Sequence, residues 1–99
     1  MGAVMSETIQ RLHVIVRGRV QGVGFRHNTV QRALQIGELR GWVRNRHDGA
    51  VEVMAEGTRA RLEMLLHYLE RGPSAAYVRD LETTWLEARG DLEPFTVRF

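Results

Sequence analysis

The stretch from Val16 to Arg26, VRGRVQGVGFR, holds the residue types best suited to binding an anion. It has glycines at positions 18, 22 and 24, and it ends on Phe25 and Arg26, where a helical pattern begins. A glycine-rich turn before a helix can point several free N–H groups at one spot, and the N-terminal end of a helix is electropositive. The planar guanidinium of Arg26 adds donors that suit phosphate oxygens. The stretch therefore predicts a phosphoryl-binding loop.

Two simpler interpretations of this stretch stay open at this point. Glycines in such a loop more often form only a tight turn. Arg26 could also point to water, or pair with a carboxylate such as Glu38 or Glu52. Its position favours an anion, because the helix dipole disfavours an arginine in the first turn unless a bound anion offsets that cost.

Asn45 is the second candidate, since it ends an expected strand just before the Asp48-Gly49 turn. Asparagine is also common near turns for local reasons, so the position alone leaves both interpretations open. The expected topology brings Asn45 to the end of the sheet that carries the glycine-rich loop. A neutral amide there would hold a water without repelling a phosphoryl group. The histidines show no metal-ligand spacing, and His27 alone borders the loop.

The elements that must position these residues follow from the apolar patterns. Helices are expected over 27–36, with Val30, Ala33 and Leu34 on one face and Gly37 as cap, and from the Thr58 cap to Gly72-Pro73. Strands are expected over 12–17, 39–45, 51–56 and 78–86, the last with an irregularity near Thr83-Thr84, and over 95–99. Asp48-Gly49 favours a hairpin.

The resulting order, β-α-β-β-α-β, predicts the α+β class and a ferredoxin-like sandwich. Two helices should cover one face of a four- to five-stranded antiparallel sheet. Residues 1–10 are expected to form a flexible tail, and residues 11–99 one domain.

Composition excludes several kinds of chemistry. The 99 residues include no cysteine, and all 14 basic residues are arginine, which rules out thiol catalysis, a Walker A motif and a Schiff-base lysine. The net charge of +2 and the scattered arginines give little support to nucleic-acid binding. An RNA-binding sheet would need exposed aromatic residues, whereas the expected strands offer Val14, Val16, Val51 and Val53.

No signal peptide or membrane span is visible, so we expect a cytoplasmic location without membrane contact.

The motifs resemble one known family. GRVQGVGFR (18–26), followed by GWVRNRHDGAVEVMAEG (41–57), is similar to acylphosphatase, and the resemblance extends over roughly residues 12–99. It implies the ferredoxin-like fold and hydrolysis of acyl phosphates to a carboxylate and inorganic phosphate, without a metal or organic cofactor. Phosphate or sulfate would be a product-like ligand, and we expect a monomer.

The resemblance also implies roles for individual residues. Arg26 and the loop residues Gln21, Gly22, Val23, Gly24 and Phe25 would bind the phosphoryl group, and Asn45 would orient the attacking water. Asn45 follows Arg26 by 19 positions, one more than is usual in the family, and the extra residue is expected between the first helix and the second strand. The alternative function is a non-catalytic module that binds phosphate or carbamoyl phosphate.

Overall fold

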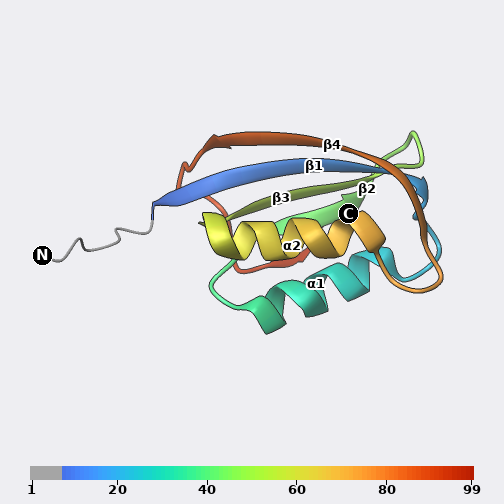
Figure 1. Ribbon diagram of the computed structural model, residues 1–99, viewed down its shortest axis with the longest axis horizontal. Helices are drawn as coiled ribbons and strands as arrows, with labels where there is room; N and C mark the ends of the chain where they lie inside the picture. Colours follow the sequence, from blue (N-terminus) through green and yellow to red (C-terminus); the bar gives the residue numbers. More distant parts are fainter. Residues whose placement is uncertain (1–7) are drawn as a thin grey trace, which may run out of the picture.

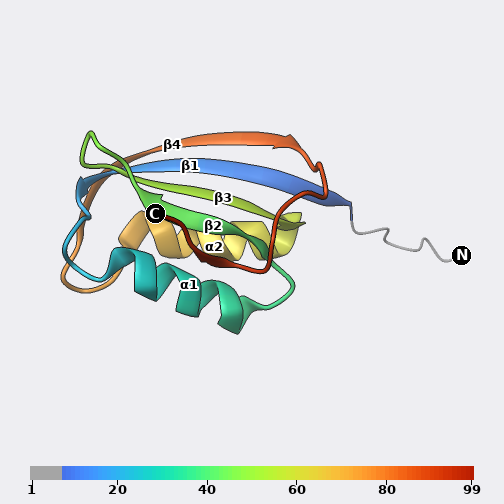
Figure 2. The same ribbon diagram turned by 180° about the vertical axis from the view of Figure 1, so that it is seen from behind.

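The structure, a computed structural model, describes residues 8–99 and has the element order expected from the sequence. One sheet has the strand order β4-β1-β3-β2-β5, and both helices cover one of its faces (Figures 1 and 2). The expected ferredoxin-like arrangement is therefore confirmed. The elements are β1 (Ile9–Arg19), α1 (Phe25–Ile36), β2 (Arg40–Asn45), β3 (Val51–Thr58), α2 (Arg59–Arg71), β4 (Tyr77–Glu87) and β5 (Thr96–Val97).

The core lies between the helices and the inner face of the sheet. Val14 of β1 pairs with Val53 of β3, and Val16 pairs with Val51. All four valines are fully buried, so they face the helices and not the open face of the sheet. The positions between them point outward, and on β1 and β3 these hold no Phe, Tyr or Trp. The helices complete the core with Phe25, Ala33, Leu62, Leu65 and Leu69.

The sheet is mixed, which corrects the expectation of an antiparallel one. Strand β5 pairs in parallel with β2, Trp42 opposite Thr96 and Val43 opposite Val97. Because β4 runs antiparallel to β1, the chain leaves β4 at the end of the sheet where β2 begins. Residues 88–95 cross that end to the opposite edge (Figure 2), so β5 can run only in the direction of β2.

The irregularity expected near Thr83-Thr84 also lies elsewhere. Thr83 and Thr84 pair regularly with β1, and the register shifts between Arg17 and Gly18. The residue left unpaired by this shift is Arg79 of β4, and Gly18 lies opposite it with a φ of 135°, a conformation that residues with a side chain rarely adopt.

The inner face of α1 differs from the expected one. Leu34 is 59% exposed, whereas Thr29 is fully buried between Phe25 and Ala33. The Thr29 hydroxyl donates a hydrogen bond to the carbonyl of Phe25 at 2.8 Å, so its polar atom is satisfied within the helix. The helix also begins at Phe25, two residues earlier than expected. In α2 the expected cap is confirmed, because the Thr58 hydroxyl accepts a hydrogen bond from the Arg61 N–H.

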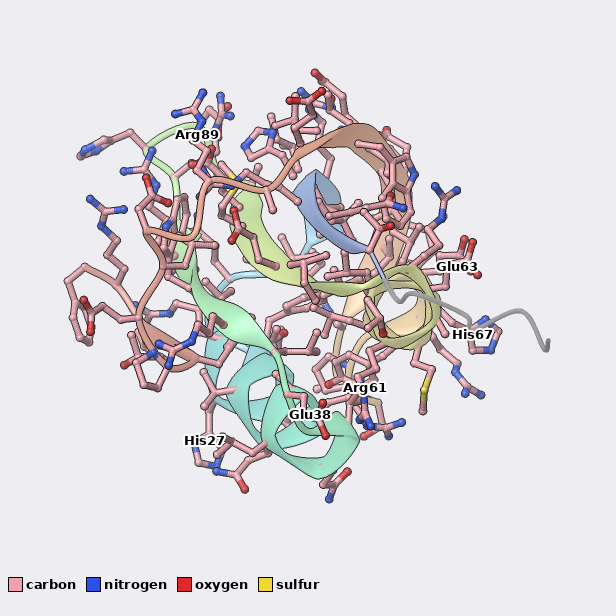
Figure 3. The ribbon with its side chains drawn as sticks, turned by 90° about the vertical axis from the view of Figure 1, so that its left-hand side faces the viewer. His27, Glu38, Arg61, Glu63, His67 and Arg89 are labelled. Atoms are coloured by element: carbon pink, nitrogen blue, oxygen red, sulfur yellow. The ribbon has the colours of Figure 1, made fainter. Side chains whose placement is uncertain are left out.

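The connection between α1 and β2 is the segment where the extra residue is expected. Gly37 donates its N–H to the Ala33 carbonyl, and Glu38 follows with a φ of 56°. Glu38 is the one non-glycine residue of the described part with a positive φ. Arg61 of α2 donates to the carbonyls of Ile36 and Gly37, and its guanidinium lies 3.6 Å from the Glu38 carboxylate (Figure 3). The connection is thus tied to the start of α2.

The expected tail falls mostly on residues 1–7, which lie outside the described residues. Its last two residues belong to the sheet, since β1 begins at Ile9. Ile9 pairs with Thr58, and Gln10 pairs with both Gly57 and Glu87. Strand β3 is longer than expected and reaches Thr58, which provides these partners.

Candidate active site

The glycine loop, residues 21–25, connects β1 to α1. Gly22 has a φ of 74° and Gly24 a φ of 78°, both in the left-handed region where other residues are strained. Gly24 is also the N-cap of α1, and the first turn of this helix contains no acidic residue. The first N–H groups of a helix have no partner within it, so this end of α1 can donate to an anion.

Arg26 is the second residue of α1 and is half-buried. Its two expected alternative partners are engaged elsewhere. Glu38 pairs with Arg61, and Glu52 binds both Arg44 at 2.7 Å and His13 at 2.6 Å. Within residues 8–99, no carboxylate lies within ion-pair distance of the Arg26 guanidinium. Its guanidinium carbon instead lies 5.3 Å from the centroid of the Phe99 ring.

Asn45 is the last residue of β2, opposite Val51 of β3. The hairpin that follows it is tight. Arg46 donates its N–H to the Ala50 carbonyl at 2.8 Å, and the Asp48 carboxylate accepts the N–H of Ala50 at 3.1 Å. That hydrogen bond, with a smaller contribution from Arg46, holds the pKa of Asp48 below its usual value. The turn expected at Asp48-Gly49 is confirmed.

One pocket of about 240 Å³ is lined both by the glycine loop with Arg26 and by Asn45. Asn45 reaches the pocket that Arg26 also lines. The Asn45 amide, the Arg26 guanidinium and the turn before α1 thus all border this pocket. The lining residues are Val20, Gly22, Gly24, Phe25, Arg26, His27, Asn45, Val97 and Phe99.

Gln21 and Val23 do not line this pocket. Val23 lines a second pocket on the side of α2. The side chain of Gln21 turns toward the β2–β3 hairpin, where its Nε2 donates to the carbonyls of Arg46 at 2.8 Å and Ala50 at 2.9 Å. The loop and the hairpin are therefore joined directly.

Two features of this site did not follow from the sequence, and a third, His27, did. The bridge made by Gln21 depends on side-chain direction in a loop, for which the residue pattern gives no signal. Val97 and Phe99 reach the pocket because β5 lies beside β2, and the parallel pairing of β5 was not foreseen. His27 lines the pocket as its position beside the loop suggested, and its side chain is otherwise exposed (Figure 3).

A metal site and a membrane-spanning helix are both absent from residues 8–99. Within residues 8–99 there is no group of three or more His, Asp or Glu side chains arranged to hold a metal ion. Neither α1 nor α2 is long and apolar enough to cross a membrane.

Comparison with known proteins decides the family. A family model described as "Acylphosphatase" matches residues 12–97. The chain belongs to the acylphosphatase family. An acylphosphatase of Anaeromyxobacter sp. (strain Fw109-5) is 50% identical over 90 residues, which cover 91% of this chain and 96% of that protein. An acylphosphatase of Trichormus variabilis is 49% identical over 88 residues, covering 89% of this chain and 85% of the relative.

Solved structures agree with this assignment. The crystal structure of acylphosphatase from Bacillus subtilis matches with a TM-score of 0.85 and 34% identity, covering 91% of this chain and 99% of that one. Acylphosphatase relatives of nearly the same length support an acylphosphatase activity over the alternative of a non-catalytic phosphate-binding module.

Proposed function

We propose that this acylphosphatase-family chain hydrolyses acyl phosphates at the pocket shared by the glycine loop, Arg26 and Asn45. The main support is that one pocket is bordered by the N-terminus of α1, the Arg26 guanidinium and the neutral Asn45 amide. Among the described residues, Arg26 has no carboxylate partner. Such a set binds a phosphoryl group and a water molecule together. Residues 11–99 act as the single catalytic domain.

Arg26 and the N–H groups of residues 21–25 bind the phosphoryl oxygens and stabilise the charge they carry in the transition state. Asn45 holds a water in line with the bond that breaks. The water oxygen forms a bond to phosphorus, the bond from phosphorus to the acyl oxygen breaks, and the carboxylate leaves with the electron pair. The proton released by the water passes to a phosphoryl oxygen. A carboxylate is a good leaving group, so no side chain is required to protonate it, and the protein contributes mainly by positioning.

The finer properties of the protein are part of the same proposal. The substrate is a small soluble acyl phosphate, and phosphate or sulfate binds in the same loop as a product-like ligand. We place the enzyme in the cytoplasm as a monomer that acts without nucleic acid or a membrane surface. The absence of cysteine from the sequence supports a reducing compartment.

The test is hydrolysis of acetyl phosphate by the purified chain in buffer with a metal chelator. We expect turnover that inorganic phosphate inhibits competitively, and a large loss of turnover in both Arg26→Ala and Asn45→Ala. Leu34→Ala serves as a control, because Leu34 lies on the exposed face of α1. Full activity in both site variants would show that these residues do not have the proposed roles.

A further inference from the structure

Asn28 lies in α1, the helix that follows the glycine loop (Figure 1), and its side chain reaches back to the start of that helix. The side-chain amide donates a hydrogen bond to the Gly24 carbonyl at 2.8 Å, and the main-chain N–H of the same residue donates to that carbonyl at 3.0 Å. One carbonyl beside the active-site pocket is therefore held by two donors from a single residue.

The held carbonyl fixes the direction of the Phe25 N–H. The two groups belong to one trans peptide unit, so they point in opposite directions. Because the Gly24 carbonyl points along α1 toward Asn28, the Phe25 N–H points out of the helix end. The pocket lined by Gly24, Phe25 and Arg26 lies at that end.

This peptide unit needs a restraint because the residue before it is glycine. Glycine populates positive and negative φ about equally, and Gly24, with a φ of 78°, has no side chain to cap the helix. A Cβ at position 24 would lie 3.2 Å from the amide nitrogen of Asn28, closer than an ordinary contact. Gly24 thus leaves room for the Asn28 amide, and the amide supplies the restraint that a glycine lacks.

A hydrogen bond to the main chain four residues back also occurs at Thr29, where it has a different purpose. The Thr29 side chain is fully buried, and its hydroxyl is satisfied by donating to the Phe25 carbonyl at 2.8 Å. Asn28 is exposed, so water could satisfy its amide, and its hydrogen bond contributes nothing to the core. Asparagine is also a weak helix former. Neither burial nor helix propensity therefore accounts for Asn28.

We propose that Asn28 is a positioning residue for phosphoryl binding. Its side-chain amide holds the peptide unit between Gly24 and Phe25 so that the Phe25 N–H donates to a phosphoryl oxygen. Donation to the carbonyl also polarises the peptide unit, which makes its N–H a stronger donor. This inference rests on the proposed binding of the phosphoryl group by the glycine loop, and it adds a residue that acts through the main chain of that loop.

Two variants of nearly equal shape isolate the hydrogen bond. In Asn28→Thr the hydroxyl can donate to the Gly24 carbonyl, as the Thr29 hydroxyl does to the Phe25 carbonyl. Asn28→Val is also branched at Cβ but has no donor. In Asn28→Val we expect the inhibition constant for inorganic phosphate and the KM for acetyl phosphate to rise about fivefold, and kcat to change by less than about twofold. Asn28→Thr should stay close to the wild type.

NMR titration with inorganic phosphate gives a readout that a purely structural role would not change. The amide proton of Phe25 should shift downfield when phosphate binds to the wild type and to Asn28→Thr, and by less at saturation in Asn28→Val. Gln31→Val is the matched control, because it places the same residue on the exposed side of α1. Thermal unfolding reports whether the variants are equally stable.

The outcomes separate this inference from the proposed function. Equal inhibition constants for phosphate and equal Phe25 shifts in Asn28→Thr and Asn28→Val would overturn the role of Asn28 alone. A lower melting temperature in Asn28→Val with unchanged phosphate affinity would overturn it as well, because the hydrogen bond would then only stabilise the helix. A wild-type chain that neither binds phosphate nor hydrolyses acetyl phosphate would overturn the proposed function together with it.

Discussion

The side-chain nitrogen of Gln21 lies 2.8 Å from the carbonyl oxygen of Arg46, the residue directly after Asn45. The same nitrogen donates to the Ala50 carbonyl at 2.9 Å, so one amide spans the base of the hairpin. In this way the loop proposed to hold the phosphoryl group also fixes the turn proposed to hold the water. Gln21 is thus a positioning residue, because its side chain acts through the main chain next to Asn45.

Gln21→Ala should therefore reduce kcat by about tenfold with a smaller change in KM, since small displacements of a positioning group cost rate more than binding. In an Asn45→Ala background the same substitution should have little further effect on kcat. Additive effects in this double-mutant cycle would contradict the coupling. Gln31→Ala on the exposed side of α1 is the matched control.

The Arg26→Ala and Asn45→Ala variants should differ in which kinetic constants they change. Arg26→Ala removes a group that binds the phosphoryl oxygens in both ground and transition states, so we expect KM and the inhibition constant for phosphate to rise and kcat to fall, by about a hundredfold or more in kcat/KM. Asn45→Ala should lower kcat and leave phosphate inhibition nearly unchanged. Steady-state kinetics with phosphate as inhibitor measures both effects, and equal losses of phosphate affinity would refute the division of roles.

Glu56 should make stability depend on pH in the acid range. Burial acts to raise its pKa, but hydrogen bonds from the Arg89 N–H, the Arg11 side chain and the Gly90 N–H outweigh it and hold the pKa below 4.5. Because the pKa of Glu56 is lower in the folded state than in the unfolded state, its carboxylate stabilises the fold above about pH 4.5. This stabilisation is lost as the pH falls through the folded-state pKa. Glu52 shifts in the same direction.

Glu56→Gln should lower the free energy of unfolding by about 2–4 kcal/mol at pH 7, because it leaves the buried Arg11 with Asp91 as its remaining partner. It should also flatten the fall in stability as the pH drops below about 4.5, because one titrating carboxyl group is removed. Urea unfolding at several pH values measures this. Glu87→Gln on β4 is an exposed control, and an equally steep acid dependence in Glu56→Gln would contradict the assignment.

Glu38→Gly should stabilise the protein by about 1 kcal/mol, because glycine adopts a φ of 56° without the strain of a side chain. The ion pair with Arg61 that is lost is exposed and contributes little. Glu38→Gln keeps the backbone strain and removes the charge, so it separates the two effects. Thermal unfolding of the three proteins gives the comparison, and a lower melting temperature for Glu38→Gly would show that the strain is absent.

The sequence predicted most strands and helices because their apolar residues repeat at the spacing of the element. Leu62, Leu65 and Leu69 repeat at helical spacing and are fully buried, and Val51 and Val53 alternate with outward residues. The same reasoning put Leu34 on one face with Val30 and Ala33, but Leu34 is exposed, and Thr29 is buried instead because its hydroxyl is satisfied by its own helix. The direction of β5 depends on how residues 88–95 cross the sheet, which no local pattern encodes.

The candidate site was predictable where motif and topology agree, and less so where side-chain direction decides. Arg26 and Asn45 were predicted to face one site and they line one pocket, although their chemical roles stay a prediction. Gln21 was predicted as a phosphate ligand, and its side chain instead binds the hairpin. Its main-chain N–H is unaffected by this and stays part of the proposed loop.

The strand order also governs when the pocket can form during folding. The central strand β1 pairs with β3 and with β4, and Arg17 meets Asp80, 63 residues further along the chain. Long-range pairings of this kind slow folding, because a large loop must close before the contacts are gained. The pocket also needs Val97 from β5, which pairs with β2. Catalytic competence should therefore arise late and cooperatively, after the residues up to Val97 have left the ribosome.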